Sequence, residues 1–152
     1  MTRYLRYFKV VKDEHRKNSG DITLPTRSDP RSAGYDFYSP IDITIQPGEK
    51  QLIWTDIKVC MLPDEVLKLY VRSSMGKYPV VIANGTGIID SSYFENTNND
   101  GNIGFNLLNL SDKPYEIHIG DRIGQGIFSK YLITDDDNAA GERTGGFGSS
   151  GV

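Results

Sequence analysis

The sequence has only one cysteine, Cys60, among its 152 residues. A single thiol excludes an intrachain disulfide and suits a reducing compartment, so we expect a cytoplasmic protein. Cys60 lies in the strand-like run 57–61, a position that favours a buried structural thiol over a nucleophile. No apolar run approaches the ~20 residues that span a bilayer. The segment 1–12 also lacks the continuous apolar stretch of a targeting signal, so we expect no membrane attachment.

The sequence also lacks a basic excess and a cluster of metal ligands. Its formal net charge is −3, which gives no indication of a surface for nucleic acid. The two histidines, His15 and His118, are isolated, so a zinc site is not predicted. His118 alternates with isoleucines and is expected to face solvent. The three aspartates at 135–137 would point in different directions on an extended chain, which favours a solvated linker over a metal site.

Sustained helical periodicity is absent, and alternating apolar residues take its place. Turn residues recur about every ten positions, a spacing typical of a sandwich, jelly roll or barrel. The sequence therefore predicts an all-β domain, with at most a short helical turn at 73–77. The alternating segments are 41–45, 67–71, 103–107 and 115–119.

The chain is long enough for one domain with a sizeable core. We assign the β domain to residues 1–133 and a linker with a C-terminal arm to 134–152. Residues 134–140 are almost free of apolar side chains, as in a linker. Turn-forming residues fill 96–101, which predicts an exposed loop.

The last twelve residues contain five glycines and no aliphatic run, so they cannot build a strand or helix of their own. Glycine N–H groups can line an anion. Arg143, Ser149 and Ser150 can bind phosphate, and Phe147 can stack on a flat ring. We interpret this segment as a flexible, glycine-rich arm that closes over a phosphorylated aromatic ligand.

Four more polar clusters lie at turns between expected strands, where binding residues are common. Asp36 follows a small-residue turn that it could simply cap. Arg72 precedes two serines and a glycine, which suits either a phosphate site or an ordinary edge turn. Asn84 and the next glycine are a strong hairpin signal, but by themselves they establish only a tight turn. Asp90 follows two isoleucines, where a carboxylate needs a catalytic role or a firm partner. Gln125 falls in a strand, where its amide can bind an oxyanion or backbone.

Together and in this order, these segments resemble the five motifs of the homotrimeric dUTPase family, the deoxyuridine triphosphate nucleotidohydrolases. The resemblance implies a jelly roll or distorted β-barrel, and a homotrimer with shared active sites. It also implies hydrolysis of dUTP to dUMP and pyrophosphate, which keeps uracil out of DNA and supplies dUMP for thymidylate synthesis. The matching segments are Ala33-Gly-Tyr-Asp36, Arg72-Ser-Ser, Gly87-Ile-Ile-Asp-Ser-Ser-Tyr93, Gly120-Asp-Arg-Ile-Gly-Gln125 and 143–151.

The resemblance also implies roles for individual residues. Asp90 would activate a water for in-line attack on the α-phosphorus, or contact the sugar 3′-hydroxyl. Tyr93 would pack on the deoxyribose and leave no room for a 2′-hydroxyl. The hairpin opened by Asn84 would bind the uracil edge, with Gly87 and Ile89 in its wall. Mg²⁺ would be carried by the three phosphates, with Asp36 reaching it through water. The phosphates and uracil would be held by Arg72, Ser73, Ser74, Gln125, Arg143, Phe147, Gly148, Ser149 and Ser150.

The chain departs from the family pattern in three places. Seven residues, 94–100, separate Tyr93 from the next glycine, where the family usually has one. We hypothesise that this insertion adds a lid or a contact for a regulatory protein partner. Arg143 and Phe147 are four apart, one fewer than is common, and Ser74 replaces a frequent glycine.

Two alternatives share the fold. A dCTP deaminase would need a glutamate in the strand after the third motif, but 101–109 contains no carboxylate and Asn106 stands at the equivalent position. A regulatory binding protein built on the same scaffold would not need Asp90, Tyr93, Arg143 and Phe147 together.

Overall fold

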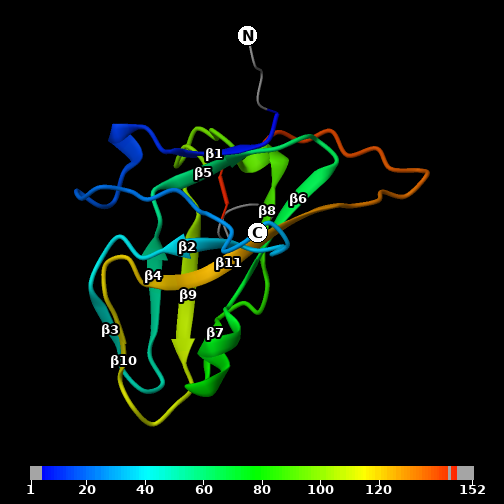
Figure 1. Ribbon diagram of the computed structural model, residues 1–152. Helices are drawn as coiled ribbons and strands as arrows, with labels where there is room; N and C mark the ends of the chain where they lie inside the picture. The colour runs from blue at the N-terminus through cyan, green and yellow to red at the C-terminus, as the bar shows by residue number, and fades with distance from the viewer. Residues whose placement is uncertain (1–4, 144, 147–152) are drawn as a thin grey trace.

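The computed structural model describes residues 5–143 and 145–146, which form eleven β-strands and three short 3-10 helices (Figure 1). The predicted site residues Phe147, Gly148, Ser149 and Ser150 lie outside the described residues. No helix in the described part of the chain is long and apolar enough to cross a membrane. The strands are β1 (Tyr7–Val10), β2 (Tyr35–Tyr38), β3 (Ile43–Ile45), β4 (Lys50–Trp54), β5 (Ile57–Cys60), β6 (Glu65–Tyr70), β7 (Val80–Ile82), β8 (Gly87–Asp90), β9 (Gly104–Asn109), β10 (Tyr115–Ile117) and β11 (Arg122–Lys130), and the helices are η1 (Asp13–His15), η2 (Ser73–Lys77) and η3 (Ser91–Tyr93).

Antiparallel pairing divides the strands among four sheets. The largest has the order β2-β11-β6-β8, and a second has the order β4-β9-β7. Two smaller sheets, β1-β5 and β3-β10, complete the molecule. In Figure 1 β2 and β11 cross in front of β4 and β9, as in a jelly roll. This arrangement confirms the predicted all-β, jelly-roll-like class.

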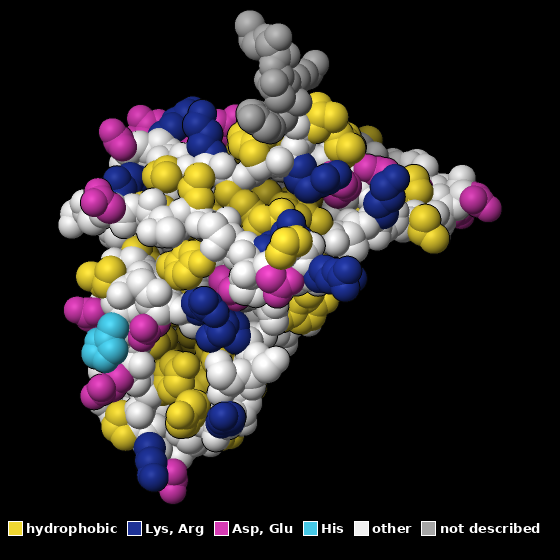
Figure 2. Space-filling view, in the orientation of Figure 1, with side chains coloured by type: hydrophobic (Ala, Val, Ile, Leu, Met, Phe, Trp, Pro, Cys, Tyr) yellow, Lys and Arg dark blue, Asp and Glu magenta, His cyan; other side chains and the backbone are white. Residues whose placement is uncertain are grey.

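The core lies between the two larger sheets because their inward side chains alternate along each strand. The rings of Phe37 on β2 and Phe105 on β9 join the sheets, with centroids 5.1 Å apart. Around this contact the inward residues of β4, β6 and β11 are almost completely buried, among them Ile53, Leu67 and Ile123. On the surface, side chains of both charge signs are interspersed over the face seen in Figure 2.

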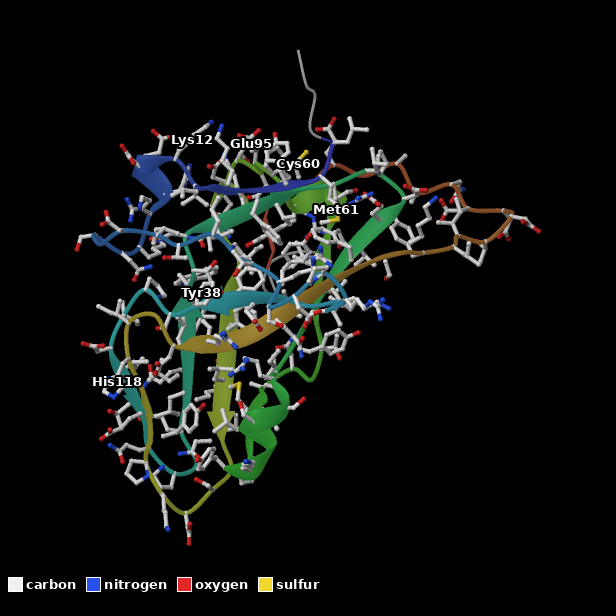
Figure 3. All side chains as sticks on the ribbon, viewed as in Figure 1. Lys12, Tyr38, Cys60, Met61, Glu95 and His118 are labelled. Atoms are coloured by element: carbon white, nitrogen blue, oxygen red, sulfur yellow. The ribbon has the colours of Figure 1, made fainter. Side chains whose placement is uncertain are left out.

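The predicted alternating segments form β3, β6, β9 and β10, and residues 73–77 form η2 as expected. His118 is 68% exposed, as predicted. It lies beside β3 and β10, far from Cys60 on β5 (Figure 3). Cys60 itself is only half-buried, so the prediction of a buried thiol was wrong.

The tight turn predicted at Asn84 and Gly85 is present, but it does not join two strands that pair with each other. Gly85 has a φ of 85°, and its N–H donates to Ile82 O at 2.8 Å, so the tight turn itself is present. However, β7 pairs with β9, whereas β8 pairs with β6. The turn therefore carries the chain from one sheet to the other.

The loop predicted to be exposed at 96–101 is only partly so, because Thr97 and Asn98 are exposed but both ends are buried. Asn96 and Asp100 are only 7% and 2% exposed. Lys58 on β5 is 1% exposed, and its Nζ lies 2.8 Å from Asp100 Oδ2 and 2.7 Å from Glu95 Oε2. The Lys12 N–H also donates to Asp100 at 2.8 Å. The insertion is thus tied to β5 by a buried ion pair that its local sequence does not reveal.

Candidate functional site

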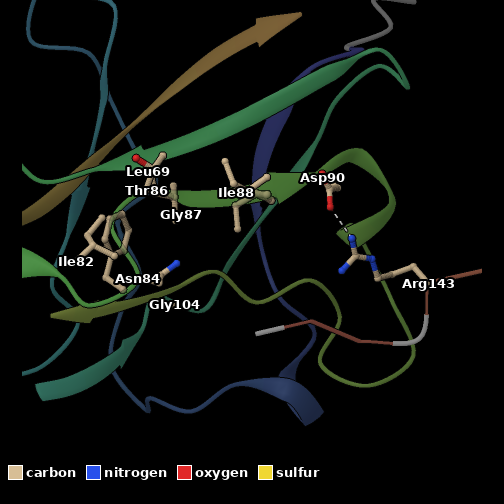
Figure 4. Close-up of a pocket in the computed structure, with 11 residues that line it drawn as sticks. Leu69, Ile82, Asn84, Thr86, Gly87, Ile88, Asp90, Gly104 and Arg143 are labelled. Carbon is tan, nitrogen blue, oxygen red and sulfur yellow. Dashed lines mark hydrogen bonds and ion pairs between the residues drawn. The ribbon is translucent and has the colours of Figure 1, made fainter. Parts of the chain in front are cut away.

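A cavity of about 300 Å³ lies where β8 passes β9 and the turn before β8. Its wall contains three of the predicted uracil-binding residues and also the predicted base, Asp90. It is lined by Leu69, Ile82, Asn84, Thr86, Gly87, Ile88, Ile89, Asp90, Gly104, Phe105 and Arg143 (Figure 4).

The local sequence explains how β8 presents Asp90. Ile89 is buried in the core at 3% exposure, and the next residue therefore turns toward the opposite side. η3 begins directly after Asp90, so the strand ends at the carboxylate. Gly87 allows β8 to lie close to β6, because a Cβ there would come within 2.9 Å of the Leu69 Cβ. The Asp90 side chain is 49% exposed and accessible to a ligand in the cavity.

Arg143, from the C-terminal arm, returns to the end of β8. Its Nη2 donates to Asp90 Oδ2 at 2.6 Å (Figure 4), and its Nε donates to the Ser92 hydroxyl at 3.3 Å. The Arg143 side chain is 20% exposed. Thus Arg143, which the sequence predicts to bind phosphate, is paired with the predicted base Asp90 of the same chain.

Tyr93 is buried beside this ion pair. The Arg143 guanidinium carbon lies 6.0 Å from the centroid of the Tyr93 ring. Gly146 packs on the same ring so closely that a Cβ there would lie 2.5 Å from Tyr93 Cε1. Burial raises the pKa of the Tyr93 hydroxyl to about 12. The arm therefore covers part of Tyr93.

A second polar cluster surrounds Asp36 on β2. Its Oδ1 lies 3.6 Å from Arg72 Nε, and its Oδ2 lies 3.8 Å from Arg122 Nε. Arg72 also donates to the Ser74 hydroxyl at 3.3 Å. Gln125, the β11 partner of Asp36, donates to the Val71 carbonyl at 3.2 Å. Guanidinium groups, hydroxyls and an amide at one strand end suit a phosphate ligand.

The structure does not bring these two clusters together within one chain. On β6, Val66 is the partner of Asp90, whereas Tyr70 is the partner of Gln125. These β6 positions are four residues apart, a separation of ~13 Å along the strand. Asp36 lies on β2, at the far edge of the sheet from β8. No residue of the Asp36 cluster lines the cavity beside Asp90.

Sequence reasoning missed several residues of these clusters. Arg122 belongs to a recognised motif, but its contact with Asp36 joins strands far apart in the sequence. Thr86 lies in the cavity wall, directly after the predicted turn at Asn84 and Gly85. Asn99 and Asn102 contact Tyr93. In the sequence they cannot be told apart from the other polar residues in and next to the insertion.

Comparisons with known proteins identify the family of the chain. The family model described as dUTPase matches residues 20–151. The deoxyuridine 5′-triphosphate nucleotidohydrolase of Lactococcus lactis is 41% identical over 151 residues, which are 97% of this chain and 99% of that protein. The enzyme of the same name from variola virus is 36% identical, over 95% of this chain and 92% of that protein.

The fold comparison gives the same result. The crystal structure of a dUTPase from Streptococcus mutans superposes with a TM-score of 0.75 at 32% identity, covering 84% of this chain and 98% of that chain. The match of a family model to most of the chain and these near full-length relatives show that the chain belongs to the dUTPase family.

Proposed function

We propose that the protein hydrolyses dUTP to dUMP and pyrophosphate. The observation that carries this proposal is Asp90, a half-exposed carboxylate in the wall of a cavity that Asn84, Gly87 and Ile89 also line. The names of the relatives from Lactococcus lactis and variola virus describe the same substrate. Family membership and site geometry therefore support one activity.

The cavity suits a pyrimidine base. Asn84, Gly87 and Ile89 line it, and its volume is about 300 Å³. Backbone donors and acceptors of these residues would bind the edge of the base. Uracil would fill this space, the methyl group of thymine would clash with the walls, and cytosine would present the opposite hydrogen-bonding pattern. Selection of the base would thus depend on shape and on backbone hydrogen bonds.

In the chemical step, Asp90 would accept a proton from the attacking water while the water oxygen bonds to the α-phosphorus. The bond from the α-phosphorus to the bridging oxygen breaks, and pyrophosphate leaves in line with the attack. Arg143 donates to Asp90 Oδ2, and it would free that oxygen for the attacking water when it moves away. Its guanidinium could then bind a substrate phosphate.

The phosphates would be held by Arg72, Ser73, Ser74 and Gln125, with Arg122 added from the structure. No group of three or more potential metal ligands occurs in 5–143 or 145–146, so a bound Mg²⁺ would take most of its oxygens from the substrate. Bound there, Mg²⁺ would neutralise charge on the phosphates. Asp36, held between two arginines, would reach the ion through water.

The separation of the two clusters in one chain supports sites that combine residues of different copies. We infer that these copies form the homotrimer implied by the family resemblance, in which one copy's phosphate cluster faces its neighbour's Asp90. The apolar run 131–133 after β11 supports association, since Leu132 and Ile133 are 97% and 69% exposed. Co-refolding an Asp90→Asn chain with an Arg72→Ala chain should restore activity, because some sites then combine two intact halves. Persistent inactivity of the mixture, with normal assembly by light scattering, would contradict shared sites.

The primary test is product analysis with dUTP, UTP, dTTP and dCTP in Mg²⁺. We expect conversion of dUTP alone to dUMP and pyrophosphate. Ammonia released from dCTP would indicate the deaminase instead. Tight dUTP binding without turnover would favour a regulatory binding protein.

A further inference from the structure

The hydroxyl group of Tyr93 forms two hydrogen bonds, both to residues in or next to the insertion. It donates to the Asn102 carbonyl at 2.5 Å. It accepts from Asn99 Nδ2 at 2.7 Å. The hydroxyl group has a single proton, which it donates to the Asn102 carbonyl. The two bonds together hold the hydroxyl end of the ring in place.

Asn99 is itself held firmly enough to act as a support. Its Oδ1 accepts from Asn96 Nδ2 at 2.8 Å and from the Gly101 N–H at 3.1 Å. Asn96 Nδ2 also donates to the Tyr93 carbonyl at 2.8 Å. The buried pair of Lys58 and Asp100 fixes the end of the same loop. The side chain that touches the Tyr93 hydroxyl is therefore part of an ordered network.

We propose that Asn99 is a positioning residue that fixes the Tyr93 ring, so that the insertion 94–100 sets the discrimination between deoxyribose and ribose. This inference rests on the proposed function and on the role that the family resemblance implies for Tyr93, whose ring would leave no room for a 2′-hydroxyl. The insertion would then act in substrate selection, rather than as the lid or partner contact that we hypothesised from the sequence.

The physical basis is steric. The Tyr93 hydroxyl is already hydrogen-bonded to Asn99 and to the Asn102 carbonyl. Tyr93 would therefore meet the sugar through its ring rather than through a hydrogen bond. Rejection of one added hydroxyl by packing alone is worth about 100-fold. A shift of the ring by a few tenths of an ångström would reduce this discrimination against ribose. The hydrogen bonds to the hydroxyl group therefore contribute to selectivity.

Asn99→Asp tests this directly, because the change is nearly isosteric. One oxygen of the introduced carboxylate can still accept from Asn96 and Gly101, but the other replaces the donor to Tyr93. The single proton of Tyr93 cannot serve both this carboxylate and the Asn102 carbonyl, so one contact is lost. Asn98→Asp is the matched control, since it adds the same charge to an exposed neighbouring side chain.

The measurement is the ratio of kcat/KM for dUTP to that for UTP. We expect Asn99→Asp to lower the ratio about tenfold, mainly through a lower KM for UTP, and Asn98→Asp to leave it within twofold. In a Tyr93→Phe background, Asn99→Asp should cause no further change, because the hydroxyl through which it acts is gone. Restoration of the ratio by Asn99→Gln, which keeps an amide donor, would add support.

Three results would overturn the inference. They are an unchanged ratio in Asn99→Asp, an equal loss in Asn98→Asp, and a full loss that persists in the Tyr93→Phe background. In each case wild-type hydrolysis of dUTP remains, so the proposed function stands. Absence of dUTP hydrolysis by the wild type would instead overturn both proposals.

Discussion

Arg143 and Asp90 form an ion pair, with Nη2 2.6 Å from Oδ2. The pair joins the C-terminal arm to the end of β8, and it engages the carboxylate that we propose as the base. Charge-assisted hydrogen bonds of this kind are stronger than neutral ones but remain reversible at a half-exposed site. Substrate phosphates would compete for Arg143, so binding of the ligand could release the base.

Asp90→Asn should bind dUTP and fail to turn it over. The amide keeps the shape of the side chain but cannot accept a proton, so we expect kcat to fall about 10²–10⁴-fold. Calorimetry with a non-hydrolysable dUTP analogue and single-turnover kinetics would separate binding from chemistry. Asp64→Asn, at an exposed carboxylate on the surface, is the control. Retention of most activity would rule out Asp90 as the base.

Gly146→Ala should detach the arm from Tyr93. A Cβ at this position would lie 2.5 Å from Tyr93 Cε1, whereas one at Gly141 would meet nothing within 4 Å. Hydrogen exchange of the Gly145 amide should therefore become faster in Gly146→Ala and remain unchanged in Gly141→Ala. Equal exchange rates in the two variants would mean that the arm does not rest on Tyr93 in solution.

The sequence predicts elements whose signal is local. Alternation alone identifies β6 and β9, because each has one face in the core. Asp90 is predicted as a site residue because a carboxylate after two isoleucines is unusual, and the structure places it on a cavity. The Asn84-Gly pair signals a tight turn, but it cannot reveal that the flanking strands pair with other partners.

Features that depend on distant partners are not predicted. The polar composition of 96–101 predicts an exposed loop. Asp100 is nevertheless buried, and it pairs with Lys58, which is 42 residues away in the sequence. Arg122 joins Asp36 only because β2 and β11 are neighbours in the sheet. The split between the two polar clusters depends on strand order and register, neither of which the motifs contain.

Tyr93 should make the folded state sensitive to alkaline pH. Burial raises the pKa of Tyr93 from 10.0 to about 12, so the folded state favours the neutral phenol. This contribution, about 2 to 3 kcal/mol, is fully present below pH 10 and is lost as the pH rises from 10 to 12. Urea unfolding at pH 9 and pH 11 should show a smaller loss of stability in Tyr93→Phe than in wild type. Tyr78→Phe, at an exposed ring, should behave like wild type.

Lys58→Met should destabilise the fold through the insertion. Methionine fills similar space but leaves Asp100, which is 2% exposed, without its cation. Removing one partner of a buried ion pair costs about 3–5 kcal/mol. Lys9→Met is the matched control, because Lys9 is the exposed register partner of Lys58 on β1. Urea unfolding at pH 7 should show the loss in Lys58→Met alone.

Acid should reduce the difference between wild type and Lys58→Met. Burial alone would raise the pKa of Asp100, but hydrogen bonds from Lys58 and the Lys12 N–H lower it below 3.8. The carboxylate therefore stabilises the folded wild type above pH 3.8, and this stability is lost as the pH falls through the folded-state pKa. Unfolding midpoints of the two proteins should accordingly converge toward pH 2. A constant difference from pH 7 to pH 2 would mean that the lysine stem, rather than the ion pair, anchors the insertion.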